Sequence, residues 1–196
     1  MNRKSLDKIA SVIGLILAVV LVGAGALLQW GGNFANGQVK DQLLSQKVTF
    51  PDKGSDSLKA LPEVDRLAME KFAGKTMSTG DQAYTYANHY IRVHMQGIGA
   101  GKTYEEVSGE WMGATAQLAA DPTNKDLAAQ VAALGNQRQA LFMGSTLMGL
   151  LGFTYAFATI AKIAIIGSYL AFAAGGILLI LAMLGFRHMR NAEIAA

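Results

Sequence analysis

The stretch ALFMGSTLMGLLGFTYAFATIAKIAIIGSYLAFAAGGILLILAMLGF, residues 140–186, decides the fold of this chain, because its only charged residue is Lys162. One straight helix over this stretch would measure about 70 Å, against a membrane hydrocarbon core of roughly 30 Å. Two arrangements fit that length. In the first, residues 141–161 and 163–186 form a hairpin of two spans that turns near Lys162. In the second, only residues 163–186 cross the membrane, and residues 141–162 end an external helix that enters it.

Two observations favour the second arrangement. Residues 159–166 contain no Gly, Pro, Asn or Asp, so the turn that a hairpin needs has no turn-forming residue. Arg187 and Arg190 follow the apolar stretch, and basic residues next to a span favour the cytoplasmic side. With the N-terminus in the cytoplasm, two crossings return these arginines to the cytoplasm, whereas three would place them outside. We therefore expect two transmembrane helices, with three as the alternative.

The first membrane segment lies near the N-terminus. Residues 12–28 carry no charge, three basic residues precede them within the first ten positions, and Trp30 follows as an interfacial anchor. Ala24-Gly25-Ala26 resembles a cleavage site, so a signal peptide is the competing interpretation. We favour an uncleaved transmembrane helix over residues 12–30, preceded by a cytoplasmic segment, residues 1–11.

Small residues recur at helical spacing in all three apolar segments. Such stripes let helix backbones approach closely in lipid, either within one chain or between subunits of a homo-oligomer, and both interpretations stay open. The positions of this set are Gly14, Ala18, Ser145, Gly149, Gly152, Ala156, Ala171 and Gly175.

Residues 31–140 carry 11 Lys and Arg against 12 Asp and Glu, and we expect them to form one small, mostly helical extracytoplasmic domain. NFANGQ, residues 33–38, predicts a loop, and KVTFP, residues 47–51, is the best strand candidate. Helices are predicted over residues 63–71 and 81–96, the second capped by Ser78. A third helix begins at Thr103, whose pairing with Glu106 predicts a capping box.

A last helix is predicted to start at Asp121, with Pro122 in its first turn, and to continue into the apolar stretch. The resulting fold class is mainly α: a membrane protein with a helical domain outside the plasma (inner) membrane and a cytoplasmic tail, residues 187–196.

MQGIGAGKTY, residues 95–104, resembles a phosphate-binding loop but fails its spacing. The motif needs a glycine five positions before Gly101, and Gln96 stands there. The preceding residues also predict a helix instead of the buried strand that the motif follows. We therefore expect no nucleotide site. Because the central region lacks a basic excess, we expect no nucleic acid partner either. The chain has no cysteine, which excludes thiol chemistry and disulfides.

Metal ligands are sparse in the predicted domain. His89 and His94 are five residues apart, about 140° around a helix, and therefore do not share a face. We interpret His94 as a hydrogen-bonded core histidine and His89 as a surface residue. If a metal site exists, Glu105 and Glu106 are the carboxylates that would join them. Tyr84, Tyr86, Tyr90 and Tyr104 predict an aromatic patch around Trp111.

The run QAYTYANHYIRVHMQGIGAGKTYEEVS, with a following Asp-Pro and a last span that ends LLILAMLGFRHMR, resembles a family of small actinobacterial membrane proteins. Many of its members carry the label aromatic ring-opening dioxygenase. The resemblance covers nearly the whole chain and implies the same order of anchor, external domain and apolar helices. Its matching positions are Asn88, His89, Gly101, Lys102, Thr103, Tyr104 and Glu106.

The label implies a non-haem iron held by two histidines and one carboxylate. The spacing of His89 and His94 does not favour such a site, so we expect neither dioxygenase activity nor a cofactor. The expected function is that of a non-enzymatic structural or accessory subunit of the cell envelope. Its partners would be membrane lipids and either copies of itself or other membrane proteins. The alternatives are a metal-dependent enzyme on the outer face and a pore or transporter component that uses Lys162.

Overall fold

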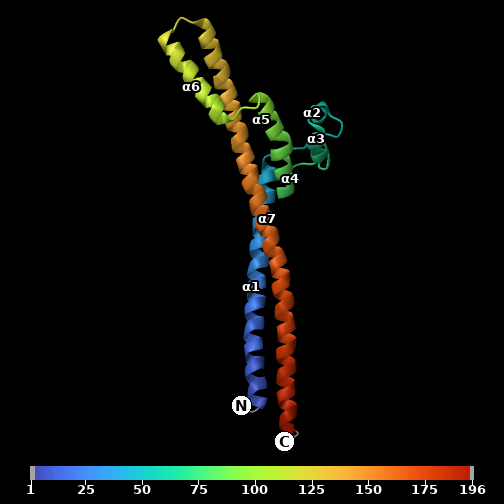
Figure 1. Cartoon of the computed structure of the whole chain (residues 1–196). Helices are drawn as coiled ribbons and strands as arrows, with labels where there is room; N and C mark the ends of the chain where they lie inside the picture. Colours follow the sequence, from blue (N-terminus) through green and yellow to red (C-terminus); the bar gives the residue numbers. More distant parts are fainter. Residues whose placement is uncertain (1–2, 195–196) are drawn as a thin grey trace. The chain divides into compact units, whose positions relative to one another are not determined.

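The computed structural model describes residues 3–194, and the side chains of residues 5–190. It is mainly helical, and no residue in the described range belongs to a strand (Figure 1). The elements in chain order are α1 (Arg3–Ser45), α2 (Asp56–Lys59), α3 (Glu63–Glu70), α4 (Gly80–Tyr86), the π-helix η1 (Ala87–Ile91), α5 (Arg92–Ile98), α6 (Tyr104–Ala120) and α7 (Lys125–Ile194). The chain divides into two compact units, one made of its two ends (up to Gln38 and from Ala158) and the other of Val39–Phe157.

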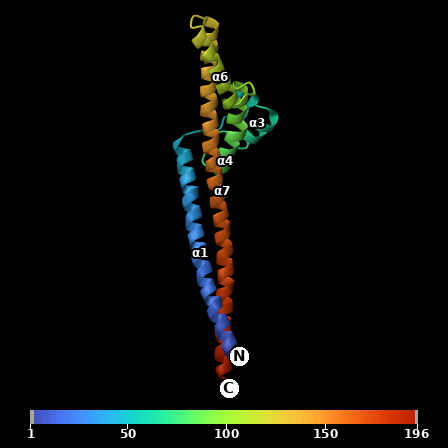
Figure 2. The ribbon, with the colours of Figure 1, turned by 60° about the vertical axis from the view of Figure 1, so that its left-hand side comes forward.

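In the unit made of the chain ends, α1 and α7 run antiparallel and side by side (Figures 1 and 2). Small residues set the distance between the two helices. A Cβ added to Gly14 would lie 3.7 Å from the Ala182 Cβ, and one added to Gly175 would lie 3.2 Å from the Ala18 carbonyl oxygen. Because such contacts need backbones close together, these four small residues lie in the seam between the two helices.

The outward faces of these two helices are apolar. Ser5–Ser45 and Lys125–Arg190 are each long and apolar enough to cross a membrane. Large side chains on both helices are more than half exposed, including Ile16 (58%), Val19 (63%), Leu170 (68%) and Ile180 (55%). Water rarely covers contiguous apolar surfaces of this kind, so this unit has the composition of a membrane-spanning helix pair.

The Val39–Phe157 unit has its own core. Leu43, Phe50, Leu58, Met69 and Met77 are at most 2% exposed. The Phe50 ring contacts the rings of Phe72 and Tyr86, with centroids 5.4 and 5.3 Å apart. Within this unit α6 lies antiparallel to the first turns of α7, as the Tyr104–Phe142 ring contact and the stacking of Arg138 over Trp111 show.

Several predicted elements are confirmed. The capping box of Thr103 and Glu106 opens α6, α3 begins directly after Pro62, and α4, η1 and α5 together cover the helix predicted over residues 81–96. The last helix also runs without a break into the apolar stretch, so the hairpin with a turn near Lys162 is wrong.

Other local predictions are wrong. Residues 33–38 belong to α1, since its helix continues through Asn33 and Gly37 instead of ending there. The strand predicted over residues 47–51 is reduced to one isolated bridge between Thr49 and Thr76. Thr79, and not Ser78, caps α4. Asp121 ends α6 instead of starting the next helix.

Candidate functional site

One wall of the candidate site is the continuous helix formed by α4, η1 and α5. Its start is fixed by a capping box, in which the Thr79 hydroxyl accepts from the Gln82 backbone N–H at 3.3 Å and the Gln82 side chain accepts from the Thr79 N–H at 3.1 Å. Ala83 and Ala87 anchor the helix in the core of the unit. The π-helical segment that follows is a rare element found often at functional sites.

The opposite wall is α7 within the Val39–Phe157 unit. Leu141 and Leu151 are buried here, and the Tyr155 ring lies 4.7 Å from the Tyr84 ring. Gly144 allows the two walls to meet, because a Cβ at this position would overlap the Met95 side chain.

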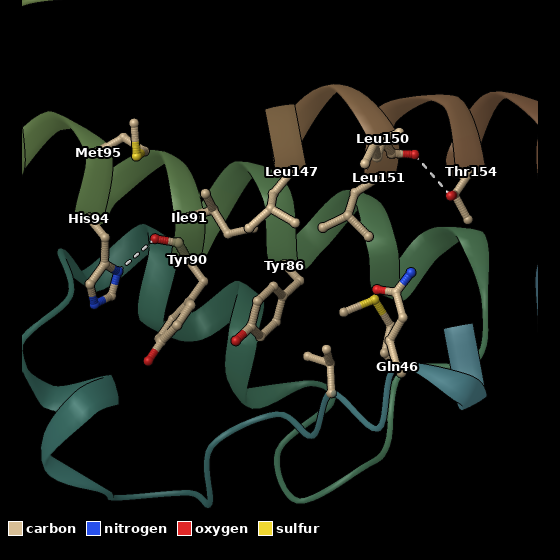
Figure 3. Close-up of a pocket in the computed structure, with 12 residues that line it drawn as sticks. Gln46, Tyr86, Tyr90, Ile91, His94, Met95, Leu147, Leu150, Leu151 and Thr154 are labelled. Atoms are coloured by element: carbon tan, nitrogen blue, oxygen red, sulfur yellow. Dashed lines mark hydrogen bonds between the residues drawn. The ribbon is translucent and has the colours of Figure 1, made fainter. Parts of the chain in front are cut away.

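An apolar cavity of about 320 Å³ lies between these walls (Figure 3). This volume falls at the lower end of the range for small-molecule sites, about 300–1,000 Å³. Residues from four parts of the unit line it: Tyr86, Tyr90, Ile91, His94 and Met95 from α4, η1 and α5; Leu147, Leu150, Leu151 and Thr154 from α7; Gln46 and Val48 after α1; and Met77 before α4. None of these is Asp, Glu, Lys or Arg.

The polar groups of the lining are neutral or already bonded. The Thr154 hydroxyl donates to the Leu150 carbonyl at 2.9 Å, and His94 Nδ1 lies 2.8 Å from the Tyr90 carbonyl oxygen, with which it forms a hydrogen bond. Burial, and secondarily the neighbouring Tyr90, raises the pKa of Tyr86 above its usual value, so its phenol stays protonated at neutral pH. The cavity therefore presents a mainly apolar surface, without Asp, Glu, Lys or Arg, to any molecule that enters it.

The weak metal candidates do not converge. His89 Nδ1 lies 2.7 Å from Asp65 Oδ1, His94 bonds to the backbone of its own helix, and Glu106 caps α6 with Thr103. Glu105 is exposed on the first turn of α6. Within residues 3–194, no three His, Asp or Glu side chains are grouped so as to hold a metal ion.

The two histidines have the opposite environments to those predicted. His94 is exposed, whereas His89 is only 24% exposed and pairs with the 13% exposed carboxylate of Asp65. The guanidinium of Arg92 lies 3.7 Å from the same carboxylate. The reason is the direction of the helix face: the face that carries His89 turns toward α3, while His94 lies at the edge of the cavity.

The residues that carry the family resemblance have structural contacts, and none of them lines the cavity. Asn88 donates to the Tyr84 carbonyl, Tyr104 packs on Phe142, and Lys102 pairs with Glu110 at 2.6 Å. The aromatic patch predicted around Trp111 is wrong, because the ring of Trp111 packs under Arg138 while Tyr86 and Tyr90 face the cavity.

The MQGIGAGKTY stretch forms a helix end and a turn. The Gly101 N–H donates to the Gln96 carbonyl and the Ala100 N–H donates to the Gly97 carbonyl, which is the bonding of a Schellman motif. Ala100 (φ 48°) and Gly101 (φ 82°) both have left-handed backbones. The glycine at 99 is needed for space, since a Cβ there would overlap the Lys102 carbonyl oxygen.

The small-residue stripes separate into two groups. Gly14, Ala18 and Gly175 lie in the seam between α1 and α7, and Ala171 is partly buried. The second group, on α7 within the Val39–Phe157 unit, is exposed: Ser145, Gly149, Gly152 and Ala156. A Cβ added to Gly149 or Gly152 would meet nothing within 4 Å.

Sequence reasoning missed the cavity, although it noted Tyr86, Tyr90 and His94. The residues that line the cavity come from a tyrosine-rich helix and from leucines more than fifty residues later. Nothing in the spacing of either segment shows that the two segments face each other. Comparison with protein-family models, curated proteins and solved structures gives no match to this chain. The family resemblance therefore stays a prediction.

Proposed function

We propose that this chain is a non-enzymatic integral membrane protein of the cell envelope. In this proposal α1 and the last part of α7 cross the plasma membrane, both termini are cytoplasmic, and the Val39–Phe157 unit is extracytoplasmic. The observation that carries the proposal is the exposure of the two apolar helices. Of the most apolar 18-residue segment of each helix, only 17% in α1 and 11% in α7 is buried within the chain. Lipid is the environment that favours such surfaces.

The absence of cysteine from the sequence makes this topology directly testable. Single cysteines at Ser5, Ala60 and Met189 report on the N-terminal end, the Val39–Phe157 unit and the C-terminal end. On intact cells, a membrane-impermeant maleimide is expected to label Ala60→Cys alone, and all three only after lysis. Labelling of Met189→Cys on intact cells would overturn the cytoplasmic C-terminus, and protein released by carbonate washing would overturn membrane insertion.

We further propose that the protein is a structural or accessory subunit of a homo-oligomer or a larger membrane complex. The support comes from α7 within the Val39–Phe157 unit, where Phe153 (66%) and Phe157 (58%) are exposed beside the unoccupied small-residue group of Gly149 and Gly152. Small residues flanked by large apolar side chains are typical of helix contacts in membranes.

Cysteine cross-linking tests this contact in native membranes. If copies of the chain meet at this face, Gly149→Cys forms a disulfide-linked dimer on mild oxidation. Gly109→Cys on α6 is the matched control, because that glycine also has nothing within 4 Å but lies outside the apolar stretch. A monomer in mild detergent, without cross-links at Gly149 or Gly152 and without co-purifying membrane proteins, would contradict the subunit proposal.

A further inference from the structure

We propose that the cavity between the α4–η1–α5 helix and α7 binds one acyl chain of a membrane phospholipid. This inference rests on the proposed insertion in the membrane and adds a specific lipid site to it. Three features of the cavity support an acyl chain as its occupant: a lining without Asp, Glu, Lys or Arg, the leucines at its mouth and its adaptable interior.

The lining excludes a charged ligand from the interior. No Lys or Arg contributes to it, so a carboxylate or phosphate inside would lose its hydration without gaining a cation. The polar side chains lie toward the two sides in Figure 3, with His94 and Tyr90 on one side and Gln46 and Thr154 on the other. Between them lie Ile91 and Leu147, which are apolar, and Tyr86, whose ring is apolar and whose hydroxyl is polar. An uncharged alkyl chain fits this distribution.

The α7 side of the cavity mouth is apolar. Leu147 and Leu150 line the cavity there and are 49% and 57% exposed, whereas the other exposed lining residues, His94 and Gln46, are polar and belong to other segments. Both leucines belong to the uncharged stretch that continues along the sequence to the predicted membrane span. An apolar mouth facing water is unfavourable, whereas an acyl chain that enters through it buries the leucines and fills the cavity.

The interior of the cavity can adapt to a flexible acyl chain. Met77 and Met95 both line the cavity, and methionine side chains adjust to irregular apolar shapes. The volume of about 320 Å³ holds roughly ten groups of the size of a water molecule at about 30 Å³ each, which suits part of one chain and not a whole phospholipid. The head group would then stay outside the cavity.

Photolabelling of the full chain in nanodiscs tests the site. The probe is a phosphatidylcholine with a diazirine in the middle of one acyl chain, and labelled residues are mapped by mass spectrometry. We expect labels on Ile91 and Met95 in addition to the outer faces of α1 and α7. Labels restricted to the outer faces, such as Ile16 and Ile180, would overturn the lipid site while leaving membrane insertion intact. Absence of labels from Ile16 and Ile180 as well would show that the proposed insertion fails.

A paired substitution makes the test specific to the cavity. Leu147→Trp fills the cavity from a half-exposed position and is expected to abolish labels on Ile91 and Met95. Phe153→Trp is the control, since Phe153 lies on the same helix outside the lining, and it should keep them. Unchanged labelling in Leu147→Trp, with normal helix content, would contradict the proposal. If that variant does not fold, Leu147→Ala enlarges the cavity instead and should increase the label.

A second probe decides whether the acyl chain in the cavity belongs to a phospholipid or to a free fatty acid. A diazirine fatty acid at the same concentration in the same nanodiscs is expected to label Ile91 and Met95 no more than the phospholipid does, because its carboxylate, like the phospholipid head group, has to stay outside the cavity. Stronger labelling by the fatty acid would show that the site takes free fatty acids and would overturn the phospholipid assignment.

Discussion

Gly32 provides the sharpest test of how α1 and α7 pack. A Cβ at this position would lie 2.6 Å from Ile165 Cγ1 and 2.8 Å from the carbonyl oxygen of Ala161. The isoleucine side chain can move, but the Ala161 carbonyl belongs to the backbone of α7, so relief requires the helices to separate. Gly31, one residue earlier in the same helix, has nothing within 4 Å and provides the matched control.

The comparison of Gly32→Ala with Gly31→Ala isolates the effect of this close approach. Both changes gain the helix propensity of alanine over glycine, about 0.5–1 kcal/mol, so this contribution cancels in the difference. Overpacking of a well-packed contact costs about 1–3 kcal/mol. We therefore expect Gly31→Ala to match or exceed the wild type and Gly32→Ala to unfold about 1–3 kcal/mol more easily than Gly31→Ala.

The assay is unfolding of the purified protein in detergent by titration with sodium dodecyl sulfate, followed by helical circular dichroism. Adding Ile165→Ala to Gly32→Ala should recover only part of the loss, since the Ala161 carbonyl oxygen stays in place. Equal stability of the Gly31→Ala and Gly32→Ala variants, within about 0.5 kcal/mol, would refute the close approach of the two helices.

Four further predictions concern the Val39–Phe157 unit. Thr103→Ala removes the capping box of α6 and should destabilise the unit by about 0.5–2 kcal/mol, measured by thermal unfolding and by faster hydrogen exchange in the first turn of α6. Hydrogen bonds from Thr103 lower the pKa of Glu106, so the stabilisation from that carboxylate is complete above its usual pKa of 4.5 and is lost as the pH falls through the lower folded value. The protection factor of the same turn, which is the intrinsic exchange rate at each pH divided by the observed rate, should therefore fall in acid, and a protection factor independent of pH in Thr103→Ala would confirm the cause. Ala100→Gly relieves a left-handed alanine and should raise stability by about 0.5–1 kcal/mol, so a lower unfolding temperature would contradict the Schellman geometry. Asp65→Ala leaves the half-buried His89 without its partner and should cost about 1–3 kcal/mol, with little change for Asp56→Ala, whose carboxylate is exposed.

The roles of individual small residues depended on tertiary structure. In sequence, Gly175 and Gly149 both belong to stripes at helical spacing in apolar segments. In the structure, a Cβ on Gly175 would meet Val22 and the Ala18 carbonyl, while a Cβ on Gly149 would meet nothing. The difference lies in which helix stands opposite each position, and spacing along one helix contains no information about its neighbour.

The sequence by itself determined some of the local features of this protein. The capping box at Thr103 depends on four consecutive residues, and the two apolar helices depend on uninterrupted runs of apolar residues. Both were therefore predictable from nearby positions alone. Tertiary structure decided the pairing of His89 with Asp65, 24 positions away, and the cavity that places Tyr86 opposite Leu151. These features depend on contacts between segments distant in sequence, which are set by the packing of the whole unit and not by the propensity or period of any one segment.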